Sequence, residues 1–349
     1  MLKWTSVAPS TVPAKFARSA LRNVSAALLL LVIALGTLWA AAAIFFDLPG
    51  PAALRYTLAA IYLAGVVAAL IITGITTRAV TSWLGAWLLI FSWWLTLKPT
   101  NERDWQSDVA RVAWAEMDGT RATIHNIRNF SYFSERDFVP EWQVATVDIA
   151  AITGVDLFVS HWGSPWIAHG IVSFAFADGT YLAASVEARK SVGQEYSAVR
   201  GFFRQYEVIY LLAQEQDVVA LRALHRRETV YLYHTRTTPT DAQNLFRHYL
   251  DQMNQARYQP EWYNALDRNC ITDFVSYLVK AKVGGISRWD WRILADGRGD
   301  EMLYDLGDLV GNLPFQELKQ RARINDAAKN GGASPDFSRR IRQQRPGFE

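Results

Sequence analysis

The sequence predicts a helical membrane anchor joined to an α+β domain with a mostly antiparallel sheet. Three runs without a charged residue, at about 24–46, 56–77 and 79–97, occupy the first hundred of 349 residues. Roughly 20 apolar residues are enough to cross a bilayer as a helix. From residue 121 onward, short apolar runs broken by turn residues are typical of strands, and helical periodicity follows from residue 238.

The three apolar runs indicate an anchor rather than a cleaved leader or a transporter. The first run is too long for the apolar core of a signal peptide, and two more runs follow it. None of them contains Asp, Glu, Lys or His, so transport or proton relay within the helices is not expected. We therefore interpret residues 24–97 as a transmembrane region with three helices.

The orientation follows from the flanking charges. Residues 1–23 carry four basic residues and no acidic one, which keeps a basic N-terminus in the cytoplasm. Three crossings then place everything after Lys98 on the opposite side of the membrane. In a Gram-negative bacterium that side is the periplasm, and the anchor lies in the inner (cytoplasmic) membrane. If the third run did not cross, the domain would face the cytoplasm instead.

The remaining chain divides into an acidic body and a basic tail. Residues 98–318 hold 22 basic and 29 acidic residues, and residues 319–349 hold eight basic and three acidic ones. A net-acidic body argues against nucleic acid as a partner. We expect 98–318 to form the periplasmic domain and 319–349 to be a weakly ordered tail.

Turn signals place the expected elements of the body. Asp178-Gly179 between two apolar runs predicts a hairpin. If Ala177 pairs with Thr180, His169 lies opposite Ala188, and Glu187 points to the other face unless a bulge intervenes. We expect strands at 123–133, 143–149, 170–176, 181–186, 206–213 and 229–234, and helices at 217–224, 238–256 and 271–281.

Cys270 is the only cysteine, so an intramolecular disulfide is impossible and zinc sites built from several cysteines are excluded. Asn269 is a good N-cap, which places Cys270 in the first turn of the 271–281 helix. There the unpaired backbone N–H groups and the helix dipole lower the pKa of a thiol and make it more nucleophilic. A cysteine that only fills space in the core is the other interpretation.

A thiolate nucleophile needs a base, and His169 is the best candidate among six histidines. It opens a predicted strand beside Gly170, whereas His161, in an aromatic loop, is the second choice. Glu187 could orient the imidazole, or it could form a structural ion pair. Asn269 could cap the helix or help to stabilise an oxyanion. The histidines lack a compact ligand spacing, so we expect neither a metal nor another cofactor.

Two motifs resemble a known group of folds. His169-Gly170-Ile171, followed about a hundred residues later by Asn269-Cys270 and Phe274, resembles the circularly permuted papain-like (NlpC-type) fold, in its lecithin–retinol acyltransferase branch. Residues 120–340 are similar to the Lnb N-terminal periplasmic domain. The matching segments are Ser185–Lys190, Tyr206-Glu207, Asp217, Arg222, Tyr231–Tyr233, Tyr263-Asn264, Ile324–Asp326 and Asp336–Ser338.

The resemblance implies a function in acyl transfer. Founding members of the Lnb family are lipoprotein N-acyltransferases, which move an acyl chain from the glycerol of a lipoprotein to its N-terminal amine. We therefore expect a membrane-anchored periplasmic cysteine acyltransferase or acyl hydrolase. Its substrates would be esters of membrane lipids or lipoproteins, attacked through a thioester intermediate. A papain-like cell-wall amidase or peptidase, and a non-catalytic scaffold, are the alternatives.

Overall fold

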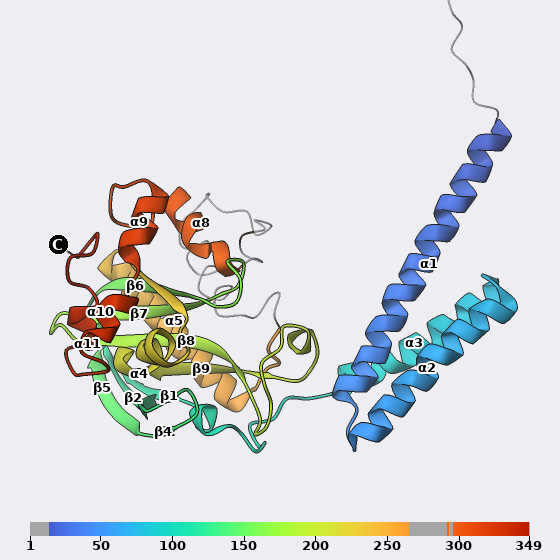
Figure 1. The fold of residues 1–349 in the computed structure, drawn as a ribbon. Helices are drawn as coiled ribbons and strands as arrows, with labels where there is room; N and C mark the ends of the chain where they lie inside the picture. The colour runs from blue at the N-terminus through green and yellow to red at the C-terminus, as the bar shows by residue number, and fades with distance from the viewer. Residues whose placement is uncertain (1–13, 265–291, 293–295, 349) are drawn as a thin grey trace, which may run out of the picture. The chain divides into compact units, whose positions relative to one another are not determined.

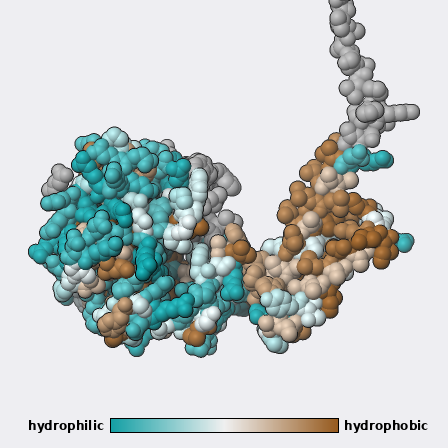
Figure 2. Space-filling model, in the orientation of Figure 1, coloured by the Kyte–Doolittle hydropathy of each residue, from teal (hydrophilic) through white to brown (hydrophobic). Residues whose placement is uncertain are grey.

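The computed structural model describes residues 14–264, 292 and 296–348. The chain divides into two compact units, Met1–Lys98 and Pro99–Glu349. The first unit presents mostly hydrophobic surface and the second mostly hydrophilic surface (Figure 2). This contrast agrees with an apolar anchor followed by a water-soluble domain.

The part of the first unit that the structure describes contains three helices that are long and apolar enough to cross a membrane. They are α1 (Ala14–Asp47), α2 (Ala52–Thr73) and α3 (Thr77–Thr96). The α2 helix ends at Gly74, whose φ of 62° lies in the left-handed region that favours glycine. Thr76 caps α3 by accepting a hydrogen bond from the backbone N–H of Ala79. The three expected helices are therefore confirmed, although α2 begins and ends four residues earlier than expected.

Hydrogen bonds from tryptophans tie α3 to α1. The indole N–H of Trp83 donates to Thr37 Oγ1 at 3.0 Å, and that of Trp94 donates to Asp47 Oδ2 at 2.8 Å. The ring of Trp83 also lies so close to Gly36 that a Cβ there would be 2.8 Å from it. Close approach at glycine is a common way for membrane helices to pack.

The second unit is built on one large sheet with the strand order β1-β2-β9-β8-β7-β6-β10, and β5 pairs with β2. All pairs are antiparallel except a single parallel contact between β2 and β9, so the expected mostly antiparallel sheet is confirmed. The strands are β1 (Trp114–Asp118), β2 (Arg121–Arg128), β5 (Trp142–Asp148), β6 (Ile152–His161), β7 (Ala168–Phe176), β8 (Tyr181–Arg189), β9 (Glu207–Ala213) and β10 (Thr229–His234). A separate hairpin is formed by β3 (Ser131–Tyr132) and β4 (Phe138–Val139).

Helices cover both faces of the sheet (Figure 1). On one face α5 (Pro239–Tyr258) buries Leu245 and Phe246 against strand residues such as Phe174. On the other face Val218 of α4 and Phe337 of α11 pack into a second core cluster. Among the described residues after α5, the helices are short: α8 (Gly299–Asp305), α9 (Phe315–Ala322), α10 (Asn325–Lys329) and α11 (Phe337–Arg340). The expected helix at 217–224 is α4 (Glu215–Ala220), which continues as the π-helical turn η4 (Leu221–His225).

The β7–β8 hairpin has a different register from the one expected. Ala175 pairs with Tyr181, and the backbone N–H of Phe176 donates to Thr180 O at 2.9 Å. Three residues therefore form the turn, and Gly179 takes a left-handed φ of 82°. A three-residue hairpin loop of this kind adds a bulge, so the register shifts by one residue. Glu187 thereby lies on the same face of the sheet as His169, which corrects the expectation that it points away.

The C-terminal segment is packed into the domain, which corrects the expectation of a weakly ordered tail. Phe337 and Ile341 are fully buried against α4 and the sheet. The guanidinium of Arg342 reaches two buried carboxylates, Asp156 at 2.8 Å and Glu215 at 2.6 Å. Pairing with acids of the core lets a basic segment be buried, and net charge alone does not reveal such partners.

Candidate functional site

His169 belongs to a buried polar network on β7 and β8. Its Nε2 lies 2.7 Å from Ser185 Oγ and 3.7 Å from Glu187 Oε1. Ser185 Oγ in turn lies 3.0 Å from Glu187 Oε1. Ser185 and Glu187 are two apart on β8, so their side chains share a face. The three groups therefore form a short hydrogen-bonded chain.

The direction of these bonds determines the tautomer of His169. An ionised carboxylate only accepts, so Ser185 must donate its single hydroxyl proton to Glu187. Ser185 Oγ can then only accept from the imidazole, which places the ring proton of His169 on Nε2. The lone pair of Nδ1 is left to take a proton. The network thus presents Nδ1 as the basic atom of the site.

Arg222 is the fourth member of the network, and its positive charge stabilises the carboxylate of Glu187. Its Nη2 donates to Glu187 Oε1 at 2.9 Å, and its Nη1 donates to the carbonyl oxygen of Val218 at 2.9 Å. Glu228 lies 4.0 Å from the same guanidinium and accepts a 2.5 Å hydrogen bond from Ser160. Glu187 therefore has a permanent cationic partner on η4.

Burial and Arg222 control the ionisation of the site. Burial is the largest cause that lowers the pKa of His169, to about 3, and the charge of Arg222 adds to it while Glu187 opposes it. Burial alone would raise the pKa of Glu187, but Arg222, His169 and Arg128 outweigh it and hold that pKa well below its usual range. At neutral pH the site therefore contains a neutral imidazole and an ionised carboxylate.

A neutral imidazole in this place can accept a proton only if a negative charge forms beside it. The imidazolium is disfavoured by burial and by Arg222, since only 12% of the His169 side chain is exposed. A thiolate next to Nδ1 would provide the compensating charge. Cys270 and Asn269, the expected nucleophile and cap, lie outside the described residues, as does the helix expected at 271–281.

His161, the second-choice base, lies on the opposite face of the sheet. It pairs with Ala168 across β6 and β7, and His169 pairs with the preceding residue, Ser160. Side chains alternate along a strand, so the two imidazoles face opposite sides. The Nε2 of His161 is buried without a hydrogen-bond partner among the described residues, and burial followed by Lys319 lowers its pKa. The structure therefore joins His169, not His161, to Glu187.

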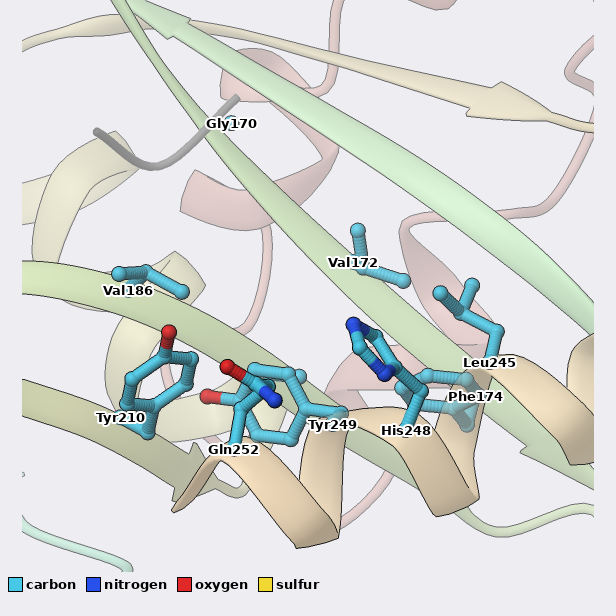
Figure 3. A pocket seen from close by; sticks show the side chains of 10 residues that line it. Gly170, Val172, Phe174, Val186, Tyr210, Leu245, His248, Tyr249 and Gln252 are labelled. Atoms are coloured by element: carbon cyan, nitrogen blue, oxygen red, sulfur yellow. The ribbon is translucent and has the colours of Figure 1, made fainter. Parts of the chain in front are cut away.

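An apolar pocket lies on the other side of β7 (Figure 3). Gly170 and Val172 line it from the strand, and His248, Tyr249 and Gln252 line it from α5. Its strand residues alternate with His169, so it opens on the face away from the imidazole. In the part of the chain that the structure describes, no group of three or more His, Cys, Asp or Glu side chains could hold a metal ion.

Comparison with protein families identifies the segment that carries this network. Residues 138–297 match the Lnb N-terminal periplasmic domain. The match contains His169, Ser185 and Glu187, and it also contains Cys270. Comparison with curated proteins gave no match, and comparison with solved structures gave none either.

The Lnb domain and the three apolar helices together indicate a membrane-anchored periplasmic protein. This agrees with the orientation expected from the basic N-terminus. Within the Lnb domain, Ser185 and Arg222 are functional candidates that were not assigned a role from the sequence. Ser185 lies two residues before Glu187 on the same strand, and this spacing is the sequence signal that could have revealed Ser185 as a candidate. The contact of Arg222 with Glu187 depends on how η4 packs on the sheet.

Proposed function

We propose that this protein is a thiol acyltransferase or acyl hydrolase that acts on esters of lipids or lipoproteins at the bacterial inner membrane. The observation that supports it is the oriented, neutral His169, held through Ser185 by the Glu187–Arg222 pair. A base with its proton fixed on Nε2 and its lone pair on Nδ1 is what a thiol nucleophile requires. The resemblance of the sequence to the Lnb family suggests the acyl chemistry and the thiol nucleophile, Cys270.

The first half of the reaction forms a thioester. Nδ1 of His169 takes the proton of the Cys270 thiol, and the sulfur attacks the ester carbonyl. Backbone N–H groups at a helix start, with Asn269 as the cap, are suitable donors to the oxyanion that develops. When the carbon–oxygen bond breaks, the alcohol leaves with the proton from His169. The acyl group remains on sulfur, and His169 is neutral again.

The second half releases the acyl group. An amine or a water molecule attacks the thioester and gives a proton to His169, and the thiolate leaves and takes the proton back. Attack by an amine gives an amide, so the enzyme is a transferase. Attack by water gives a fatty acid, so it is a hydrolase. Glu187 stays ionised throughout, because Arg222 stabilises its charge.

The order of the two residues in the chain, with the histidine before the cysteine, supports a permuted papain-like arrangement. His169 is on β7, and Cys270 follows it by 101 residues in the sequence. The base and the nucleophile therefore come from separate elements, with the base first in the chain. This arrangement accounts for a Cys-His site in which Ser185 and Glu187 occupy the orienting position.

The proposal is tested by profiling lipids and lipoproteins in cells. Cells that carry Cys270→Ser or His169→Gln in the full chain are compared with wild type by mass spectrometry, with His161→Gln as the matched histidine control. We expect the first two variants to lose one acylated product and to accumulate its precursor, and the control to match wild type. Equal amounts of each protein in the membrane are verified by immunoblotting.

Two outcomes would overturn the proposal. If cell-wall fragments changed while lipids and lipoproteins did not, the same Cys-His pair would serve an amidase or peptidase. If neither class changed in Cys270→Ser cells, and those cells kept full cellular function, the domain would be a non-catalytic scaffold.

A further inference from the structure

Two loops leave the same end of the central sheet. In the antiparallel β6–β7 pair His161 lies opposite Ala168, and in the β8–β9 pair Arg189 lies opposite Glu207. The β6–β7 loop (162–167) and the β8–β9 loop (190–206) therefore both extend from the end at which β7 begins. His169 is the second residue of β7, so the candidate site lies at this end too.

Both loops expose large apolar side chains to solvent. In the β8–β9 loop Val192 is 59% exposed, Val199 57% and Phe202 44%. In the β6–β7 loop Trp166 is 53% exposed and Ile167 42%. Single exposed apolar residues are ordinary, but their concentration in two loops at one sheet end marks a surface that meets an apolar partner.

The chain that leaves the membrane anchor is bound to the β8–β9 loop. Val192 N–H donates to Asp104 O at 2.8 Å, and Gln106 N–H donates to Lys190 O at 3.0 Å. Thr100 N–H donates to Glu207 Oε1 at 2.7 Å. These contacts fix residues 100–106 to the start and the end of the loop.

The covalent length of the chain limits how far this loop can lie from the bilayer. The last apolar helix ends at Thr96, and only four peptide steps separate it from Thr100. Four residues span at most about 14 Å when fully extended. The sheet end that holds Glu207 is therefore tied to the end of the last apolar helix by a short segment of chain.

The charge of the β8–β9 loop complements a lipid surface. The loop holds Lys190, Arg200 and Arg204 against a single acid, Glu195, although the body of the domain is net acidic. Basic residues beside apolar ones attract anionic lipid headgroups and let the apolar side chains enter the interface.

We propose that the β6–β7 and β8–β9 loops form a membrane-docking surface, which seats the sheet end that carries His169 on the lipid interface of the protein's own membrane. Val192, Val199, Phe202, Trp166 and Ile167 insert among the headgroups, and Lys190 and Arg200 contact lipid phosphates. The docking depends on the exposed surface and on the tether, and not on any chemistry of Cys270.

The test measures the depth of single spin labels in the full chain, reconstituted in vesicles of phosphatidylethanolamine and phosphatidylglycerol. Cys270→Ala removes the native thiol, and Val199→Cys or Phe202→Cys carries a nitroxide. Ala177→Cys is the control, because Ala177 is exposed in the β7–β8 turn at the other end of the sheet. Electron paramagnetic resonance compares collisions of each label with oxygen, which concentrates in lipid, and with a water-soluble nickel chelate.

We expect the labels at 199 and 202 to be more accessible to oxygen than to the chelate, and the label at 177 to show the reverse. Omitting phosphatidylglycerol should make the first two labels more accessible to the chelate. Chelate accessibility at 199 and 202 equal to that at 177 would overturn the proposal, and so would protection of those labels from both reagents. Activity on lipids or lipoproteins is not part of the readout, so failure of this test and failure of the proposed function are distinguishable.

Discussion

Ser185 is the link between the imidazole and the carboxylate. His169 Nε2 and Glu187 Oε1 are 3.7 Å apart, which is too long for a direct hydrogen bond, whereas Ser185 Oγ is within bonding distance of both. The hydroxyl therefore holds the ring in the tautomer that leaves Nδ1 basic. Ser185 is a positioning residue, because it acts on the reaction only through His169.

Replacing Ser185 should impair the site without unfolding the domain. Ser185→Ala removes the acceptor for Nε2–H, so the ring loses its fixed tautomer, and we expect product formation to fall about 10²-fold, at the lower end of losses of general base function. The measurement is the rate of thiol alkylation at Cys270 against pH, together with product formation in cells. A Ser185→Ala protein with wild-type values in both assays would show that the hydroxyl has no role.

Neutral His169 also makes stability depend on pH. The folded state binds a proton on this imidazole only near pH 3, whereas the unfolded chain does so near its ordinary value of 6.5. The unfolded state therefore binds more protons between these values, and stability falls as pH drops from 6.5 toward 3. Above pH 6.5 the contribution is fully present.

We expect His169→Gln to lose less stability on acidification than wild type does. Denaturant unfolding of the detergent-solubilised full chain at pH 7 and at pH 5 measures the difference between the two proteins. If the two proteins lost stability equally between these pH values, the imidazole would not be the buried neutral group described here.

At the scale of elements, one glycine sets the register on which the site depends. Asp-Gly was enough to predict the hairpin from the sequence, but both two-residue and three-residue loops can contain this pair. The choice between them decides which face of the sheet Glu187 occupies, because a one-residue shift reverses every side chain. Local sequence predicted the element but not its register.

Gly179 should tolerate only residues that accept a left-handed backbone. Its φ is 82° and a Cβ would meet open space, so the cost of a substitution is conformational rather than steric. We expect Gly179→Val to lower the free energy of unfolding by about 1–2 kcal/mol. Gly179→Asn, the control, should lose less, because Asn adopts this conformation more readily. Equal losses for the two variants in thermal or denaturant unfolding would contradict the conformational account.

The packed C-terminal segment depends on Arg342. Its guanidinium contacts Asp156 and Glu215, which are 1% exposed or less, and lies 3.4 Å from the ring centre of Tyr181. Removing the cation leaves the buried Glu215 without its counter-charge and Asp156 with His234 Nδ1, at 2.7 Å, as its remaining ionisable partner. Arg342→Met should therefore destabilise the domain by about 3–5 kcal/mol.

The matched control for this prediction is Arg339→Met, because the side chain of Arg339 is 77% exposed and its ion pair with Asp336 is 3.8 Å long. We expect no more than about 0.5 kcal/mol of change in that variant. Denaturant unfolding of both variants tests the difference, and similar stabilities would show that the tail does not depend on its buried arginine.

At the scale of the whole molecule, patterns that involve many residues were predictable and contacts between distant residues were not. Runs of about twenty apolar residues revealed all three helices of the first unit, and alternation revealed the strands around His169. The packing of Arg342 against Asp156 joins residues 186 positions apart, and Arg222 joins Glu187 across a helix and a sheet. Such pairs leave no periodic pattern in a single sequence. The packing of the C-terminal segment and the contact of Arg222 with Glu187 could therefore be found only in the structure.

The account rests on an imidazole that takes its proton from one thiol. Cys270 is the only cysteine, so alkylation of the full chain reports on that thiol alone. The decisive measurement is the rate of alkylation against pH in wild type and in His169→Gln. We predict that at neutral pH the thiol is alkylated faster in wild type, where His169 can take its proton, than in the variant. Identical profiles in the two proteins, with ionisation at or above the ordinary value, would contradict the pairing of Cys270 with His169.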